Sequence, residues 1–180
     1  MADIVSVPGV RLAYPHLHEP YAFREGDTPK YSALILIPKD NNAAVKQITD
    51  SIEQCKAEFA AKHHRAFSGR TPMKDGAENA KHPEFADFMT INATTSVKAP
   101  PVVVDEDCEE LADDSTLYPG IGVRVAMRPY SYSVAGNTGI SMALNGVMVE
   151  DRTTDRLEGG NRLSELGFSP VSPRSPGALI

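Results

Sequence analysis

The sequence predicts a mainly β protein, a small barrel with one or two helices and long loops. Three observations lead to this fold class. About five short segments have the alternating or continuous apolar pattern of strands, one segment has the period of an amphipathic helix, and glycine-containing irregularities interrupt the longer strands. Bulged strands in a small sheet favour a closed barrel, because each bulge bends the strand that carries it.

The first half of the chain contains two expected strands. Residues 5–14 alternate apolar and polar side chains around Pro8-Gly9, which indicates a strand that is broken or bulged near its start. Residues 15–29 form a polar, proline-rich connection. Residues 31–37 are almost entirely apolar, as expected for a strand that is covered on both faces.

A helix is expected over residues 42–62, with Asp40 or Asn41 as its N-cap. Its apolar residues recur every three or four positions and form one stripe: Val45, Ile48, Ile52, Cys55 and Phe59. The stripe predicts packing against the sheet. Residues 63–87 are polar and contain several breakers, so a long excursion with at most a short helix is expected there.

Four further strands are expected at residues 88–93, 102–104, 123–132 and 140–149. The turn residues Ala135–Gly139 predict a hairpin between the last two. Asn145-Gly146 shifts the alternation of the final strand, as a glycine bulge does. Residues 1–165 are therefore expected to form one domain, and residues 166–180, with three prolines among serines, a flexible tail.

The segment from Val123 to Tyr132 carries the main functional pattern. Strand alternation places Val123, Val125 and Met127 on one side and a row of arginines and tyrosines on the other: Arg124, Arg128, Tyr130 and Tyr132. Guanidinium groups pair with phosphates and aromatic rings stack on unpaired bases, so this row predicts a surface for single-stranded nucleic acid. The alternative is a solvated strand face, and Pro129 is a residue that can break the alternation.

The net charge of −6 comes from one segment. Seven acids lie at residues 105–114, and without them the charge would be +1. A solvated loop is the usual form of such a run. In contrast, residues 62–74 contain four basic side chains and no acid, and a local field of this kind matters more to a polyanion than the total charge does.

The chain offers little for catalysis. Its histidines lack metal-ligand spacing, and there is no phosphate-binding glycine loop or nucleophile elbow, so we expect no cofactor, no metal and no enzyme. Two alternatives stay open: a phage nuclease or recombination accessory enzyme that uses Mg²⁺ at the acids of residues 105–114, and a structural protein of a virion.

No apolar run is long enough to cross a bilayer, and the first residues do not have the pattern of a signal peptide. A cytoplasmic protein without membrane association is therefore expected. Cys55 and Cys108 are expected to be free thiols in a reducing compartment. The strands, helix and long loops together fit a five-stranded OB-type barrel, a fold that binds oligonucleotides on one sheet face and the adjoining loops.

Several short motifs carry a family resemblance over about residues 5–150. They are Arg11-Leu-Ala-Tyr14-Pro15, Pro29-Lys30-Tyr31 with Pro38-Lys39, Pro72-Met-Lys74-Asp75-Gly76, Tyr118-Pro-Gly120 and Leu144-Asn145-Gly146-Val147. In order and spacing, this set resembles the phage-type single-stranded DNA-binding proteins first catalogued as a domain of unknown function. The resemblance implies an OB-like fold and sequence-independent DNA binding in phage or prophage replication and recombination, within the bacterial host cell.

The candidate DNA-binding residues come from two sources. The resemblance implies Tyr14, Lys30, Tyr31, Lys39 and Lys74, of which Tyr31 is equally compatible with a place in the core. The residue pattern adds Arg65, Phe67, Arg70, Lys98, Arg124, Arg128, Tyr130 and Tyr132. The cations are expected to neutralise phosphates, and the aromatic rings to stack on bases.

The resemblance also implies an acidic tail, because proteins of this functional kind often end in one that competes for the DNA groove and recruits replication partners. Residues 170–180 of this chain contain no acid. The acids of residues 105–114 are a candidate internal substitute that competes with DNA or contacts replication and recombination proteins, and Leu179-Ile180 is a candidate docking tip for a partner. Deletion of residues 105–114 should then strengthen DNA binding. Pairing of an uncapped sheet edge with a second copy would make a homo-oligomer, but the sequence does not identify such an edge.

Overall fold

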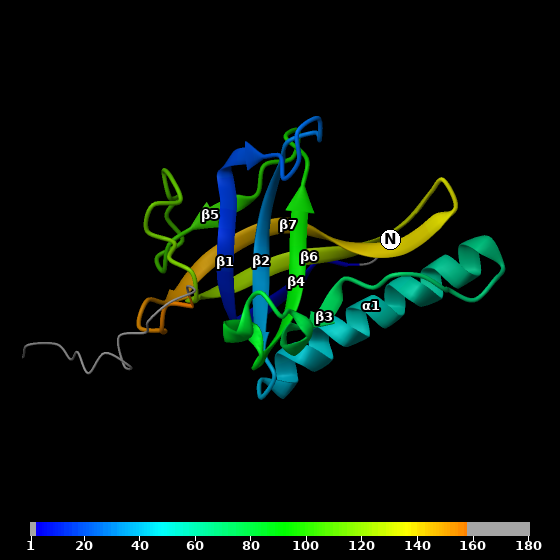
Figure 1. Ribbon diagram of the computed structural model, residues 1–180, viewed down its shortest axis with the longest axis horizontal. Helices are drawn as coiled ribbons and strands as arrows, with labels where there is room; N and C mark the ends of the chain where they lie inside the picture. Colours follow the sequence, from blue (N-terminus) through cyan, green and yellow to red (C-terminus); the bar gives the residue numbers. More distant parts are fainter. Residues whose placement is uncertain (1–2, 158–180) are drawn as a thin grey trace, which may run out of the picture.

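The structure, a computed structural model, describes residues 3–157 and contains a closed ring of five strands (Figure 1). In chain order the ring strands are β1 (Val5–Tyr21), β2 (Lys30–Pro38), β4 (Phe88–Thr95), β6 (Ile121–Val134) and β7 (Asn137–Asp151). They pair in the order β1, β2, β4, β7, β6 and back to β1, and only β4 and β7 run parallel. This mixed barrel with one helix is OB-fold-like, which confirms the predicted fold class.

Two short strands extend the sheet beyond the ring. β3 (Met73–Asp75) pairs with β4, and β5 (Val102–Val104) pairs with β7. The prediction for residues 63–87 was wrong in part, because this stretch contains β3 and two 3-10 turns, η1 (Gly76–Glu78) and η2 (Pro83–Phe85). Three residues are too few to show the alternation of a strand in the sequence, and β3 is defined by its pairing with β4.

β1 is longer than the sequence predicts. The expected irregularity at Pro8-Gly9 is confirmed, since Gly9 has a φ of +71° and the pairing with β6 shifts between Val7 and Val10. However, the strand continues through residues 15–21, which were predicted as a connection. The prolines are tolerated because the described pairing of β1 with β6 ends at Leu12, and beyond it β1 pairs with β2 alone.

The barrel interior is filled by the alternating apolar residues of all five strands. Among the fully buried ones are Val7, Leu12, Ile35, Ile91, Val125 and Met142. The helix α1 (Asn42–His63) packs against β1 and β6 through the predicted stripe, and Asn41 is its N-cap, with its side chain accepting a hydrogen bond from the Ala44 N–H. Cys55 is buried in this stripe, Cys108 is exposed, and both are free thiols, as predicted.

The β6–β7 hairpin confirms the predicted alternation. Val123, Val125 and Met127 are buried, and the ladder continues through Pro129, which lies opposite Met142. The bulge lies at Asn145, because Ala126 pairs with Gly146 and the next residue of β6 pairs with Leu144. The outer part of the hairpin, residues 130–141, extends beyond the ring beside α1 and is called the arm below (Figure 1).

Within residues 3–157, no helix combines the length and the apolar character needed to cross a membrane. The expected tail at residues 166–180 lies outside the described residues, and the expected domain boundary at residue 165 stays a prediction.

Candidate nucleic-acid interface

The outer surface of β1, β2 and β4 forms a continuous face whose side chains are set by the strand register; we call it the open face. Paired residues of neighbouring strands point to the same side of a sheet. Four rows of paired residues cross this face: Arg11, Leu36, Thr90 and Lys74; Ala13, Leu34 and Asn92; His16, Ser32 and Thr94; Tyr21 and Lys30. In an OB-type barrel this is the face of the second and third strands, where oligonucleotides bind.

One end of the open face is covered by a small apolar cluster. The turn η2 places Phe85 against the sheet, where it is 1% exposed. The cluster consists of Ala13, Leu36, Phe85, Phe88 and Leu157. The Arg11 guanidinium lies 5.5 Å from the centre of the Phe88 ring, in a cation–π arrangement. This end is therefore closed to a base, and it supports the rest of the face.

The other end carries exposed aromatic rings. Tyr21 is 46% exposed and Phe23 is 60% exposed. The ring of His16 stacks on Tyr21 at 4.3 Å with an angle of 8° between the planes, and Phe23 meets Tyr21 edge-on at 5.1 Å. These ring contacts are mutually stabilising, and Tyr21 and Phe23 remain open to solvent. We call His16, Tyr21 and Phe23 the aromatic cluster.

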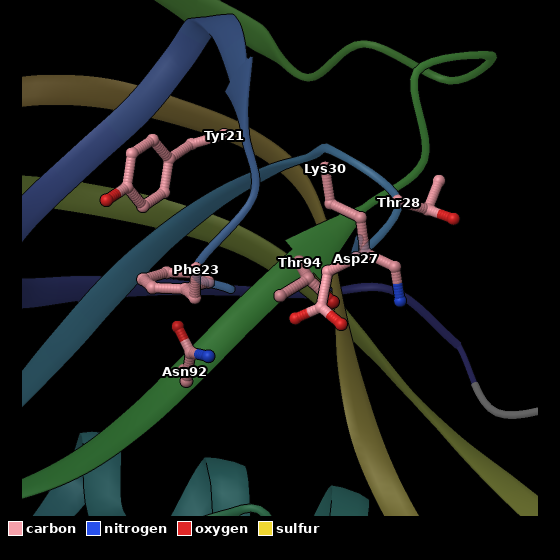
Figure 2. Close-up of a pocket in the computed structure, with 7 residues that line it drawn as sticks. All are labelled: Tyr21, Phe23, Asp27, Thr28, Lys30, Asn92 and Thr94. Atoms are coloured by element: carbon pink, nitrogen blue, oxygen red, sulfur yellow. The ribbon is translucent and has the colours of Figure 1, made fainter. Parts of the chain in front are cut away.

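A hollow of about 420 Å³ lies beside the aromatic cluster (Figure 2). Its lining comes from β1, β2, β4 and the loop between β1 and β2: Tyr21, Phe23, Asp27, Thr28, Lys30, Asn92 and Thr94. Figure 2 shows the two aromatic rings on one side of the hollow and Asp27 and Thr28 on the other. The hollow therefore joins a stacking surface to hydrogen-bonding groups.

Two lysines of the open face are available for phosphates. Lys30 and Lys74 are exposed at opposite ends of the face, and within residues 3–157 neither forms a salt bridge. Lys39 differs, because its Nζ lies 2.6 Å from Asp75, where it donates a hydrogen bond that lowers the pKa of that carboxyl group. Lys98 is exposed in the connection between β4 and β5. Of the cations predicted to bind DNA, the strand register therefore places Lys30 and Lys74 on this face.

Tyr14 also reaches the open face. It has a φ of +48° at a bulge of β1 and is 45% exposed. Its hydroxyl lies 3.3 Å from His82, and its ring meets Phe85 edge-on at 6.3 Å. Burial, together with the charge of Glu84, raises the pKa of Tyr14, so the phenol stays neutral at physiological pH. Tyr31 shares the parity of the buried Ile35 and is half-buried on the inner side.

The arm and the segment after α1 gather a second set of predicted residues. The backbone of Arg70 pairs with β7, accepting a hydrogen bond from Ile140 and donating one to Thr138. Other members of the set are Arg65, Phe67, Tyr130 and Tyr132. The Arg65 guanidinium lies 5.5 Å from the ring centre of Phe59, and Phe67 meets the same ring edge-on, so these two side chains pack on the helix end.

The arm tyrosines differ in exposure. Tyr130 is 42% exposed beside a hollow lined by α1 residues such as Phe59 and Lys62. Tyr132 is half-buried and lies over Gly139 on the opposite strand, where a Cβ atom would come within 2.4 Å of its hydroxyl. In the OB topology the arm is the connection between the fourth and fifth barrel strands, which also contacts oligonucleotides.

The structure does not bring Arg124 to the open face. β6 pairs with neither β2 nor β4, and the Nε of Arg124 donates a 3.3 Å hydrogen bond to Glu150. Arg128 is half-buried further along β6. The alternation predicted for this strand is therefore correct, but its arginines and tyrosines lie over different parts of the barrel.

The acidic segment folds into a defined loop, which we call the acidic loop (residues 105–114). It packs against the edge of β1 that faces away from β2, to the left of β1 in Figure 1. Asp114 accepts a 2.9 Å hydrogen bond from the Leu17 N–H and a 2.6 Å bond from His18 Nδ1, while His18 Nε2 donates to the Leu111 carbonyl at 2.7 Å. Arg152 forms two 3.0 Å contacts with Glu106 and lowers the pKa of that carboxyl group.

The aromatic cluster and the polar residues beside it were not predicted from the sequence. Tyr21 and Phe23 lie in a stretch that was predicted as a polar connection, and Asn92 and Thr94 were assigned only to a strand. A signal was present, because two aromatic residues in a proline-rich connection next to Lys30 are unusual for a solvated loop. Their convergence depends on the strand register, which the sequence does not state.

A closed five-stranded barrel with exposed, mutually packed aromatic rings, and with lysines that form no salt bridge within residues 3–157, on the face of its second and third strands has the fold and surface of a single-stranded nucleic-acid-binding protein. The chain belongs to the family described as "Enterobacter phage Enc34, ssDNA-binding protein", whose sequence model matches residues 3–175. The predicted membership of this family is therefore confirmed. The prediction of a phage protein that binds single-stranded DNA is confirmed with it. The family is one of binding proteins rather than enzymes.

Three individual proteins illustrate what this chain is similar to. The structure of the single-stranded DNA-binding protein from bacteriophage Enc34 in complex with ssDNA has a TM-score of 0.70 and 30% sequence identity, covering 82% of this chain and 86% of that chain. Protein p50 of Acyrthosiphon pisum secondary endosymbiont phage 1 is 28% identical over 93% of this chain and 94% of its own length. Bacteriophage T7 gp2.5 shares the fold, with a TM-score of 0.56 at 15% identity over 88% and 97% of the chains.

Proposed function

We propose that this protein coats and protects single-stranded DNA, without regard to sequence, during phage or prophage replication and recombination in the cytoplasm of the bacterial host. The observation that carries the proposal is the aromatic cluster, mutually packed and solvent-exposed beside Lys30 over β2 and β4. Rings of this kind stack on any unpaired base, and a duplex does not present its bases in that way.

The proposed DNA path begins at the open face and continues onto the arm. On the open face, Tyr21, Phe23 and Tyr14 stack on bases while Lys30 and Lys74 neutralise phosphates. Further along, the exposed Tyr130 and Arg70 extend the same chemistry. Loops after the first and fourth barrel strands contact oligonucleotides in this fold, and here these are the loop after Tyr21 and the arm.

The nuclease alternative has no site in the part of the chain that the structure describes. Among residues 3–157, no group of three or more His, Cys, Asp or Glu side chains is arranged to hold a metal ion. Contacts with replication or recombination proteins through the acidic loop belong to the same proposal, whereas the C-terminal docking tip lies outside the described residues.

The test is fluorescence anisotropy with a labelled single strand and its duplex, at low and moderate salt and without Mg²⁺. We expect tight binding that prefers the single strand and weakens steeply with salt. The double variant Tyr21→Ala/Phe23→Ala should bind at least about tenfold more weakly, since stacking contributes about 1–3 kcal/mol per base.

Val102→Ala is the matched control for that variant, because Val102 is also exposed and apolar but lies on β5, away from the open face. It should bind like the unaltered protein. Equal affinity of the double variant and the control would remove the aromatic cluster from the proposed interface.

A further inference from the structure

The hollow beside the aromatic cluster has lining groups that a sequence-indifferent stacking surface does not require. Besides Tyr21, Phe23 and Lys30, it contains the side chains of Asp27, Thr28, Asn92 and Thr94. Its volume of about 420 Å³ falls within the range of small-molecule sites, about 300–1,000 Å³. The hollow is therefore large enough for a planar group, and its lining combines aromatic rings with polar side chains.

Asp27 determines which part of a DNA strand can enter. Among the lining residues within 3–157, Asp27 has the only anionic side chain, and its carboxylate repels a phosphate. Lys30 lines the same hollow, and its ammonium group attracts a phosphate instead. A nucleotide bound here thus places its base in the hollow and its phosphate toward Lys30. The base then lies between the aromatic rings on one side and Asp27 on the other (Figure 2).

An ionised carboxylate only accepts hydrogen bonds, so it distinguishes among base edges. Cytosine, adenine and guanine each present an exocyclic amino group, whose N–H is a donor for a carboxylate. Thymine has a single ring N–H that lies between two carbonyl oxygens, and those oxygens are repelled by the carboxylate. The amide of Asn92 and the hydroxyl of Thr94 can donate to the acceptor next to the amino group.

We propose that this hollow is a base subsite that favours nucleobases with an exocyclic amino group over thymine, and that Asp27 sets this preference. The inference rests on the proposed function and refines it. Sequence-tolerant coating persists, because stacking and phosphate contacts supply most of the affinity and the preference acts at one nucleotide of the bound strand.

The experiment compares two oligonucleotides that differ only in the edge that Asp27 reads. Oligo-5-methyl-dC and oligo-dT of equal length carry the same methyl group and differ in the amino group and the adjacent ring nitrogen. Anisotropy competition with the full-length protein should give roughly three- to tenfold tighter binding of oligo-5-methyl-dC, which is less than a buried charge-assisted hydrogen bond would give, because Asp27 is exposed.

Asp27→Asn should bring the ratio of the two affinities to within about twofold, chiefly by strengthening the binding of oligo-dT, because the repulsion of its carbonyl oxygens is removed. Glu25→Gln is the matched control, since Glu25 is an exposed acid of the same loop that does not line the hollow. This control loses the same charge and should keep the preference. Thermal melting of both variants verifies that the fold is intact.

The possible outcomes separate the two claims. Tight binding with equal affinity for both oligonucleotides, or a preference that survives in Asp27→Asn, would overturn the base subsite while leaving the proposed function in place. Absence of binding to either oligonucleotide at low salt would overturn the proposed function and the subsite with it. A preference that is lost equally in Glu25→Gln would assign the effect to loop charge and reject the role of Asp27.

Discussion

The open face extends from β1 across β2 and β4, whereas the acidic loop packs on the edge of β1 that faces away from β2. Charged side chains are arranged in opposite ways in these two regions. On the open face, Lys30 and Lys74 form no salt bridge within residues 3–157. In the acidic loop, Glu106 and Asp114 are held by Arg152 and His18. A net charge of −6 therefore says little about the ligand, because the anionic groups are concentrated and partly neutralised in one loop while the cations that matter are left open.

The strongest test of this contrast reverses the charge of the open face. The double variant Lys30→Glu/Lys74→Glu should bind single-stranded DNA roughly 10- to 100-fold more weakly at moderate salt, and its log–log salt slope should fall by about 0.7 for each lost phosphate contact. Anisotropy titrations at several salt concentrations measure both quantities. Lys46→Glu/Lys56→Glu on α1 makes the same change in net charge away from the face and should bind nearly normally. Equal losses in the two variants would show that only the total charge matters.

The second test removes the anchor of the acidic loop. Both ring nitrogens of His18 face acceptors that have no proton to give, so these contacts favour the protonated, positively charged imidazole. His18→Gln should destabilise the protein by about 1.5–3 kcal/mol near pH 6, because it removes charge-assisted hydrogen bonds. Thermal or urea unfolding measures the loss. Hydrogen exchange should show it first in the loop, and unchanged loop protection would contradict the anchoring role.

The pH dependence of that loss has a definite sign. Burial alone lowers the pKa of His18, but the hydrogen bonds to Asp114 and the Leu111 carbonyl and the charge of Asp114 outweigh it, so the pKa is raised. Protonation then stabilises the fold fully below about pH 6.5, the ordinary value, and the contribution disappears as the pH rises through the higher folded pKa. The difference in melting temperature between the protein and His18→Gln should therefore shrink with rising pH. A difference that stays constant from pH 6 to 9 would contradict a charged His18.

A smaller effect is expected from the exposed acids of the loop. Neutralising Asp107, Glu109, Glu110 and Asp113 to the corresponding amides should strengthen DNA binding by a few-fold at low salt, and by little at 0.15 M salt, where charges are screened over about 8 Å. Anisotropy at the two salt concentrations measures this. A gain above about tenfold that persists at 0.15 M salt would instead support direct competition between the loop and DNA.

The smallest expected effect concerns Arg152. The ion pair with Glu106 is exposed, so Arg152→Gln should change the free energy of unfolding by no more than about 1 kcal/mol and leave DNA affinity unaltered. Urea unfolding and anisotropy provide the two values. A larger loss would mean that the Arg152 contact, rather than His18, holds the loop.

The sequence predicted the elements whose patterns are local. Alternation identified the buried row of β6, the turn residues identified the hairpin, and the glycine bulges were placed correctly in β1 and β7. It failed at residues 15–21, where prolines suggested a connection, because their tolerance depends on which side of β1 lacks a partner.

The same distinction applies to the site. Lys30 and Lys74 were identified by family resemblance, but the placement of Tyr21 beside Asn92 and Thr94 results from the pairing of three strands and from the loop between two of them. Arg124 shows the converse, because its strand was predicted correctly and its position in the ring was not. Alternation assigns a side chain to one face of a strand, and barrel closure decides where around the ring that face lies.

The backbone of the acidic loop also covers the outer edge of β5. The Leu111 N–H donates to the Val103 carbonyl at 3.0 Å, and Val104 forms a bridge with Glu110. Under the proposed function, copies that coat one DNA strand would be held at high effective concentration, a condition in which an open strand edge can pair with the next chain. By occupying that edge with its own backbone, the loop removes a place where another chain could add a strand to this sheet.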